Sequence, residues 1–273
     1  MPFVDSHCHL STPELRVDWS QIRAQMQAAD VQCALNVCTA WADIDAVCAF
    51  AAASPSAPTI WASVGVHPEE QGGFEPSVED LCRAAQHPRV VAVGETGLDF
   101  YRPDGADFQI TDPAVQRKRF RVHIRAARRL KLPLIIHTRC SFAETVDVLR
   151  DENRHDAGAL NGVFHCFTED TAAARVALDL GFYISFSGIV TFKNARTVQE
   201  TARFVPADRL LIETDSPYLA PVPFRGRCNT PALVPHVAAK LAELRGTSVE
   251  SIAAITADNF TQLFTKTGNT SGH

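Results

Sequence analysis

The sequence predicts an α/β fold, a (β/α)8 TIM barrel with an extra C-terminal helix. Eight short apolar runs recur along the 273 residues, and segments with helical periodicity lie between them. Alternating strands and helices are typical of a parallel sheet covered by helices, and eight such units usually take about 250 residues. Because no linker or change of composition divides the chain, we expect one domain over residues 1–264 and a flexible tail over residues 265–273.

The predicted strands are short and rich in Val, Ile and Phe. In chain order they cover residues 3–4, 31–39, 60–65, 90–94, 134–137, 162–167, 182–187 and 210–214. Parallel strands buried on both faces have such continuous apolar runs, whereas half-exposed strands alternate apolar and polar residues. The pattern therefore favours a barrel enclosed by helices.

The clearest predicted helices between these strands cover residues 19–29, 113–130, 170–180 and 231–244. The first carries Ile22 and Met26 on one stripe. The second begins with Pro113 in its first turn, and the third ends before Gly181, a suitable C-cap. Residues 252–264 follow the last strand and predict the extra helix.

Composition narrows the class of protein. The net charge of −5 gives no support for a broad basic face that binds nucleic acid. No apolar stretch approaches the ~20 residues of a membrane span, and no signal peptide is recognisable. The eight cysteines form no C-x-x-C pair, so we expect them to be reduced and mostly buried. We expect a cytoplasmic protein that does not bind membranes, with no obligate protein partner evident.

Six potential metal ligands stand at the ends of five predicted strands. They are His7, His9, Glu95, His137, His165 and Asp215. Catalytic groups of a barrel enzyme gather at the C-terminal ends of its strands, so these side chains should meet at one mouth. Imidazole nitrogens and carboxylate oxygens suit divalent cations, among which Zn²⁺, Mn²⁺, Mg²⁺ and Co²⁺ are not distinguishable here. The set is large enough for two divalent metal ions.

Each candidate ligand also has a structural alternative. His7 and His9 lie on the same side of a strand and could bind one ion, or be incidental polar residues. Glu95 would be buried and would need a cation, although a helix cap or a salt bridge would also explain it. Glu213 and Asp215 share one side of their strand, so either could be the ligand.

Four further residues are candidate substrate contacts. His67 could donate a hydrogen bond to a substrate oxyanion or pack under a loop. Tyr101 could stack on a base or anchor its own loop. Arg139 could orient a ligand or form a surface salt bridge. Arg225 lies in the loop after the eighth strand, where many barrels bind phosphate.

Two close metal ions can generate a hydroxide, hold an electrophile and stabilise both the entering and the leaving oxygen. The candidate ligands therefore indicate hydrolysis of a phosphoester or an amide-like bond.

The chain resembles the TatD family of metal-dependent deoxyribonucleases, within the amidohydrolase-like barrels. The matching segments are residues 5–9, 65–68, 94–100, 135–137, 165–167 and 213–219. The resemblance implies a dinuclear site in which His7, His9 and Asp215 hold one ion, His137 and His165 hold the other, and Glu95 bridges. It further implies hydrolysis of DNA, as single strands or ends, by a metal-bound hydroxide. Glu95 and Asp215 are the expected catalytic residues, with Asp215 orienting or deprotonating the attacking water.

Two other functions stay open. An amidohydrolase or phosphotriesterase-like enzyme would act on a small molecule, but its relatives often place a lysine after the fourth strand, where this chain has Glu95. A non-catalytic barrel would bind nucleic acid or protein, and the intact ligand set argues against it. Cys140, Cys228 and Thr230 depart from the family's usual acidic and basic residues, so they bear on substrate preference.

Overall fold

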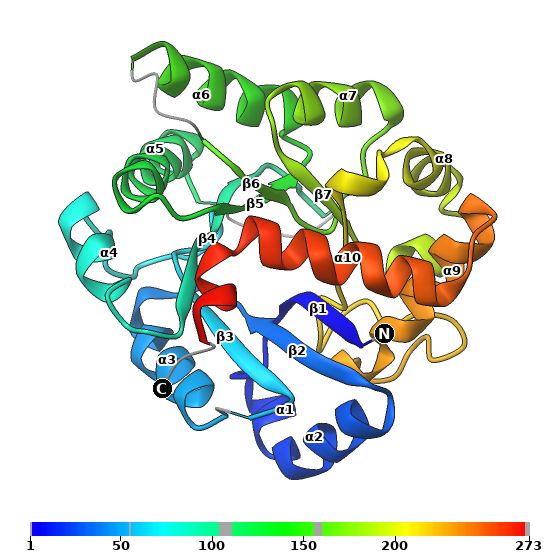
Figure 1. Cartoon of the computed structure of the whole chain (residues 1–273). Coiled ribbons are helices and arrows are strands. Elements are labelled where there is room, and N and C mark those ends of the chain that lie inside the picture. The colour runs from blue at the N-terminus through cyan, green and yellow to red at the C-terminus, as the bar shows by residue number, and fades with distance from the viewer. Residues whose placement is uncertain (1, 55, 104–110, 156–159, 271–273) are drawn as a thin grey trace.

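Eight parallel strands form a single sheet in the order β1 to β8, with helices on its outside (Figure 1). The computed structural model describes residues 2–54, 56–103, 111–155 and 160–270. The strands are β1 (Phe3–Cys8), β2 (Val31–Asn36), β3 (Thr59–Val64), β4 (Val90–Asp99), β5 (Leu134–Arg139), β6 (Gly162–Phe164), β7 (Tyr183–Phe186) and β8 (Leu210–Ile212). The α/β barrel predicted from the sequence is confirmed.

The helices follow the strands in alternation. Their bounds are α1 (Pro13–Arg16), α2 (Trp19–Ala28), α3 (Ile44–Ala52), α4 (Val78–Ala84), α5 (Pro113–Leu130), α6 (Phe142–His155), α7 (Thr171–Asp179), α8 (Arg196–Phe204), α9 (Val234–Arg245) and α10 (Val249–Leu263). Short 3₁₀ helices are η1 (Trp41–Asp43), η2 (Gly188–Thr191), η3 (Ala207–Arg209), η4 (Pro231–Leu233) and η5 (Thr265–Thr270). Helix α5 has the predicted bounds, whereas the helix predicted over 231–244 divides into η4 and α9.

The barrel closes between β8 and β1 beyond the regular end of β8. Cys8 and Ser216 form a parallel bridge, and the amide of Asp215 donates to the carbonyl of His7 at 2.9 Å. Asp5 strengthens this seam, because its buried carboxyl group accepts from the amide of Thr214 at 2.9 Å and from its hydroxyl at 2.5 Å. The seam therefore fixes the ends of β1 and β8, which carry several of the candidate ligands.

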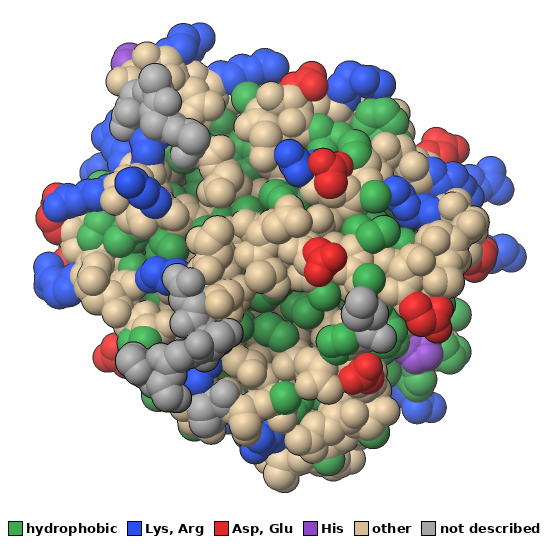
Figure 2. Space-filling model, viewed as in Figure 1, with side chains coloured by type: hydrophobic (Ala, Val, Ile, Leu, Met, Phe, Trp, Pro, Cys, Tyr) green, Lys and Arg blue, Asp and Glu red, His purple; other side chains and the backbone are tan. Residues whose placement is uncertain are grey.

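Helix α10 closes the N-terminal end of the barrel. It crosses in front of the strands in Figure 1, and Phe260, Leu263 and Phe264 are buried against the strand side chains. Asn259 donates to the carbonyls of Ala207 and Leu210 at 2.7 and 2.8 Å, which fixes the helix beside the start of β8. On this face, shown in Figure 2, Lys and Arg side chains lie mostly toward the rim. Because α10 covers this end of the barrel, the functional site is expected at the opposite end.

Strand β4 extends beyond its predicted end at Gly94 as far as Asp99. The glycines do not turn the chain away, because Gly94 and Gly97 have φ values of +135° and +142° and lie close against β5. A Cβ at Gly94 would lie 2.5 Å from the carbonyl oxygen of Ile135. The pairing with β5 shifts register between Val93 and Thr96. Glu95 is consequently a residue within a strand, not one that follows it.

All eight cysteines are free, but the expectation that they are mostly buried is wrong: three are buried (Cys8, Cys38 and Cys48), three are half-buried (Cys33, Cys82 and Cys166), and Cys140 and Cys228 are exposed. The boundary between the domain and a tail stays a prediction. Of the expected tail, residues 265–270 form η5, where Lys266 Nζ donates to the carbonyl of Val90 at 3.2 Å, and residues 271–273 lie outside the described part. Within the described ranges, no helix is long and apolar enough to span a membrane.

Candidate metal centre

The candidate ligands meet at the C-terminal end of the barrel, beside a cleft of about 590 Å³. Of the six predicted ligands, five line the cleft: His9, Glu95, His137, His165 and Asp215. The sixth, His7, is fully buried directly beneath them. Because the side chains come from β1, β4, β5 and the ends of β6 and β8, only the closed barrel brings them together.

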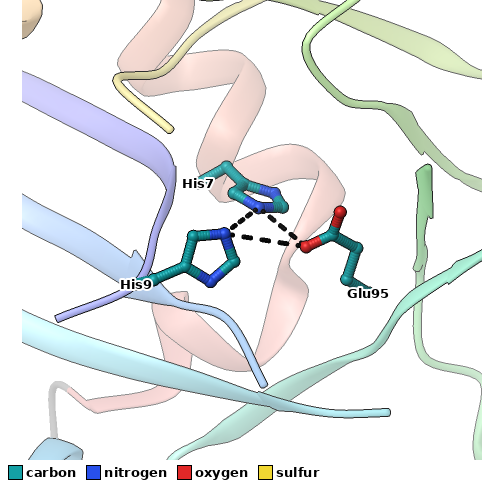
Figure 3. Close-up of side chains that lie close together, drawn as sticks. All are labelled: His7, His9 and Glu95. Atoms are coloured by element: carbon teal, nitrogen blue, oxygen red, sulfur yellow. Dashed lines mark hydrogen bonds and ion pairs between the residues drawn. The ribbon is translucent and has the colours of Figure 1, made fainter. Parts of the chain in front are cut away.

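The first group of ligands surrounds one oxygen of Glu95 (Figure 3). His7 Nε2 lies 3.3 Å from Glu95 Oε2 and 3.3 Å from His9 Nε2. His9 Nε2 lies 3.7 Å from the same Glu95 oxygen. Asp215 Oδ1 completes the group at 3.6 Å from His7 Nε2 and 3.4 Å from His9 Nε2. Two nitrogens and two carboxylate oxygens thus face a common point.

The second group surrounds the other oxygen of Glu95. His137 Nδ1 and His165 Nε2 each lie 2.9 Å from Glu95 Oε1, and 3.3 Å from each other. His67 Nε2 approaches the same oxygen at 3.5 Å. Glu95 is 3% exposed, so its carboxylate is almost fully enclosed by imidazoles. One carboxylate therefore faces two separate groups of nitrogens, one with each oxygen.

The electrostatics of the cluster favour ionised carboxylates. Burial alone would raise the pKa of Glu95, but the neighbouring His165 and the hydrogen bonds from the imidazoles hold it well below its usual range. Burial likewise opposes the charged form of Asp215, yet the hydrogen bond from His9 lowers its pKa to about 2. For His165, the effect of burial is exceeded by the charge of Glu95, which raises the pKa well above the usual value. The site therefore holds buried, ionised carboxylates. Bound cations could neutralise this negative charge in place of the protons on the histidines.

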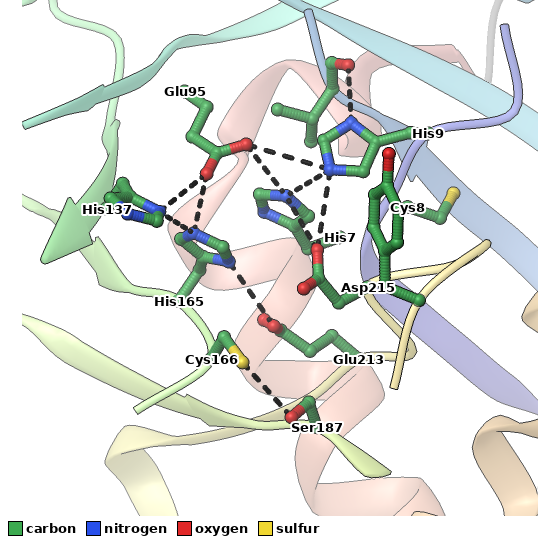
Figure 4. A network of polar contacts seen from close by, with 12 residues as sticks. His7, Cys8, His9, Glu95, His137, His165, Cys166, Ser187, Glu213 and Asp215 are labelled. Carbon is green, nitrogen blue, oxygen red and sulfur yellow. Dashed lines mark hydrogen bonds and ion pairs between the residues drawn. The ribbon is translucent and has the colours of Figure 1, made fainter. Parts of the chain in front are cut away.

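The far side of three candidate histidine ligands is held by an oxygen acceptor, and Figure 4 shows the contacts of His9 and His165. His9 Nδ1 faces the carbonyl of Val37 at 3.2 Å, and His137 Nε2 lies 2.9 Å from Asp99 Oδ2. His165 Nδ1 lies 3.4 Å from Glu213 Oε1. Metal-binding histidines usually donate their other N–H in this way, which fixes the ring and points the second nitrogen at the ion.

The backbone at the mouth is also unusual. Asp215 and Cys166, which directly follows His165, have positive φ values of 55° and 45°. Non-glycine residues in this left-handed region are uncommon, and they concentrate where a structure holds a functional side chain in place. Asp215 is turned in this way just after β8 ends.

The donor set fits divalent cations. His7 Nε2 faces His9 Nε2, Glu95 Oε2 and Asp215 Oδ1 at once, and one ring nitrogen can donate at most one hydrogen bond. A cation among these atoms would satisfy all four, because neutral imidazoles and carboxylates are the ligands that Zn²⁺, Mn²⁺ and Co²⁺ accept.

The predicted substrate contacts divide into two pairs. His67 and Arg139 line the cleft. Tyr101 and Arg225 do not; the Arg139 guanidinium lies 3.7 Å from the Tyr101 ring centroid, and Arg225 lies 3.8 Å from that of Phe192. Neither residue therefore lines the cleft, and their role in binding stays a prediction.

Two residues contact candidate ligands in a way that sequence reasoning did not assign. Asp99 lies in the part of β4 beyond its expected end, and its Oδ2 lies 2.9 Å from His137 Nε2. Glu213, the alternative to Asp215, is fully buried and contacts His165, whereas Asp215 lines the cleft, so Asp215 stays the preferred candidate ligand. The alternation of side chains along β4 would have placed Asp99 on the side of Glu95.

Comparisons with known proteins show that this chain is similar to metal-dependent hydrolases. A model of the TatD related DNase family matches residues 4–265. The "Uncharacterized metal-dependent hydrolase YcfH" of Escherichia coli (strain K12) is 46% identical over 268 residues, covering 97% of this chain and 96% of that protein. The "3'-5' ssDNA/RNA exonuclease TatD" of Salmonella typhimurium is 33% identical over 213 residues, covering 76% and 78%. The crystal structure of YJJV, a TatD homolog from Escherichia coli K12, has a TM-score of 0.84 at 29% identity and covers 96% and 98% of the two chains.

Proposed function

This chain belongs to the TatD-related DNase family of metal-dependent hydrolases, and on that premise we propose that it is a deoxyribonuclease that hydrolyses phosphodiester bonds with two divalent ions. The observation that carries the proposal is the position of Glu95, whose two oxygens face separate pairs of histidines. A bridging carboxylate requires this arrangement.

In this proposal His7, His9 and Asp215 would hold one ion, His137 and His165 would hold the other, and Glu95 would serve both. Such a pair of ions supplies a nucleophile at neutral pH and stabilises charge on the entering and leaving oxygens. Which of Zn²⁺, Mn²⁺, Mg²⁺ or Co²⁺ is bound is not fixed by ligands of this type.

Asp215 orients the attacking water. Its contacts with the histidines are made by Oδ1, which leaves Oδ2 to accept a hydrogen bond from water. Because its pKa is lowered to about 2, with the His9 hydrogen bond outweighing burial, the carboxylate is ionised across the neutral range. The ionised carboxylate can therefore accept a hydrogen bond from the water and hold it in line with the phosphorus, although a pKa this low makes it a weak base.

His67 donates a hydrogen bond to a phosphate oxygen. Its Nδ1 accepts from the amide of Glu69 at 3.1 Å, so the proton of the neutral ring is on Nε2, which points into the site. Burial and the neighbouring His137 lower the pKa of His67 to about 3, so the ring stays neutral at physiological pH.

The substrate in this proposal is single-stranded DNA or a DNA end. The cleft of about 590 Å³ has the size of a small-ligand pocket and admits a nucleotide more readily than an intact duplex. Arg139 and Tyr101 form a stacked pair beside it, and stacked aromatic and guanidinium groups commonly bind bases of single strands. The Salmonella relative is named as a single-stranded DNA and RNA exonuclease, which supports the same substrate class. We further propose that the protein acts in the cytoplasm.

The test combines metal analysis with cleavage of defined substrates. Purified protein is depleted of metal, reloaded with Zn²⁺, Mn²⁺ or Mg²⁺, and assayed on single-stranded DNA, blunt duplex DNA and a phosphotriester. We expect metal-dependent cleavage that is fastest on single-stranded DNA. Turnover of the phosphotriester with no DNA cleavage would replace the proposal with a small-molecule hydrolase. Equal cleavage with and without chelator would eliminate the metal mechanism.

A further inference from the structure

Glu213 lies beneath the candidate ligands and has one unused oxygen. The residue follows β8 directly and is fully buried. Its Oε1 lies 3.4 Å from His165 Nδ1. Its Oε2 is buried and has no hydrogen-bond partner among the described residues. A buried acceptor without a partner is costly, so the unused oxygen needs an explanation.

His7 also has a buried polar atom without a hydrogen-bond partner among the described residues, and this atom is a potential donor. Its ring is stacked on that of His165, with centroids 3.9 Å apart and planes within 8° of parallel. Its Nε2 faces Glu95 and His9, whereas its Nδ1 is buried and has no partner within the described part of the chain. A ring nitrogen of His7, one of His165 and a carboxylate oxygen of Glu213 lie within 4.8 Å of one another.

The unused atoms are a potential donor and an acceptor in the same cluster. We propose that Glu213 is a positioning residue whose carboxylate accepts from Nδ1–H of both His7 and His165, directly after a small rotation or through one buried water. This proposal rests on the proposed metal centre and adds to it a residue that contacts neither ion.

The consequence follows from the grouping of the ligands. With hydrogen on Nδ1, each ring presents the Nε2 lone pair toward Glu95, where an ion would bind. His7 belongs to the first ligand group and His165 to the second. Asp99, in contrast, faces His137 alone. Glu213 therefore orients one ligand of each ion, and its loss should lower the binding affinity for both ions together.

The test measures metal binding directly. Zn²⁺ is titrated calorimetrically into metal-free full-length protein, as wild type, Glu213→Gln and Asp99→Asn. Both substitutions replace a carboxylate by an amide of similar shape, so they form a matched pair. We expect wild type to bind two ions. Glu213→Gln should bind both ions about 10–100-fold more weakly, whereas Asp99→Asn should lose affinity for only one of them. The amide carries no charge, so its oxygen is a weaker acceptor for one ring, and its NH₂ group cannot accept from the other ring at all.

Two further measurements separate positioning from charge or misfolding. Glu213→Asp keeps the charge but withdraws the carboxylate by one methylene, so it should also weaken both ions; wild-type affinity in this variant would overturn the positioning role. In the zinc-loaded protein, long-range ¹H–¹⁵N spectra should show hydrogen on Nδ1 of His7 and His165. Glu213→Asp carries the binding test if circular dichroism shows that Glu213→Gln does not fold.

The possible failures are distinguishable. If wild type binds two ions and Glu213→Gln binds both equally well, or loses affinity for only one, Glu213 does not serve both rings and the inference is wrong while the proposed function stands. If wild type binds no divalent ion, the proposed function fails and this inference fails with it.

Discussion

Protonation of His123 should destabilise the protein below neutral pH. This histidine on α5 is fully buried; its Nε2 accepts from the amide of Val66 at 3.0 Å, and its Nδ1 lies 2.8 Å from the carbonyl of Arg119. The neutral ring with hydrogen on Nδ1 satisfies both contacts, whereas the protonated ring would turn Nε2 into a donor facing another donor. Burial, with the nearby Arg119 charge, lowers the pKa of His123 to about 4.

The pKa difference sets the sign and the size of the effect. The folded pKa of about 4 lies below the ordinary value of 6.5, so the unfolded chain binds more protons between these values. The stabilisation is therefore complete above pH 6.5 and is lost progressively as the pH falls toward 4. At about 1.4 kcal/mol per pKa unit, the loss from this residue is about 2 kcal/mol at pH 5 and about 3 kcal/mol at pH 4.

The assay is urea unfolding of metal-free wild type and His123→Gln between pH 5 and pH 8. The glutamine can still accept from Val66 but does not titrate. We expect the variant to be less stable at pH 7.5, and the difference in free energy of unfolding to shrink by about 2 kcal/mol at pH 5. Taking the difference removes the titration of the other histidines, provided that they behave alike in both proteins. A difference that stays constant from pH 8 to pH 5 would refute the reasoning.

Three further predictions concern the candidate site. Glu95→Gln should abolish activity and reduce bound metal toward one ion or none, as measured by atomic absorption; two ions with full activity would contradict a bridging role. Asp215→Asn should lower kcat at least ~100-fold at saturating metal, and Glu213→Gln should lower it less; the reverse order would mean that the wrong carboxylate was chosen. Arg225→Ala should raise KM for DNA with no change in metal content, and an unchanged KM would indicate a structural role.

The ligand-bearing end of the barrel could be predicted because its information is local. His7 and His9 alternate on one strand, and His137 closes an apolar run, so each position follows from the chain nearby. The end of β4 could not be predicted in the same way. Gly94 and Gly97 usually indicate a turn, and only the close approach of β5 shows that they allow the strand to continue. Asp99 was missed for this reason.

The choice between Glu213 and Asp215 required depth, which the sequence does not contain. Two residues apart on one side of a strand, they appeared equivalent. In the structure β8 ends at Ile212, and Asp215 adopts a φ of 55° that brings it beside His9 at the mouth. Glu213 lies deeper, where its Oε1 contacts Nδ1 of His165. Tertiary structure thus places the two carboxylates at different depths, which the sequence pattern does not show.

Three acidic side chains along the seam between β1 and β8 show how depth decides their protonation and their contacts. Asp5 is the deepest; burial raises its pKa to about 8, and its hydrogen bonds to Thr214 join the strands. Glu213 contacts the far side of His165. At the mouth, the His9 hydrogen bond outweighs burial and lowers the pKa of Asp215 to about 2. Because the layers share β1 and the end of β8, a change in the seam should move the ligands above it. The amide of His7 donates to Asp5 Oδ1 at 3.2 Å, which ties this candidate ligand to the deepest of the three acidic side chains.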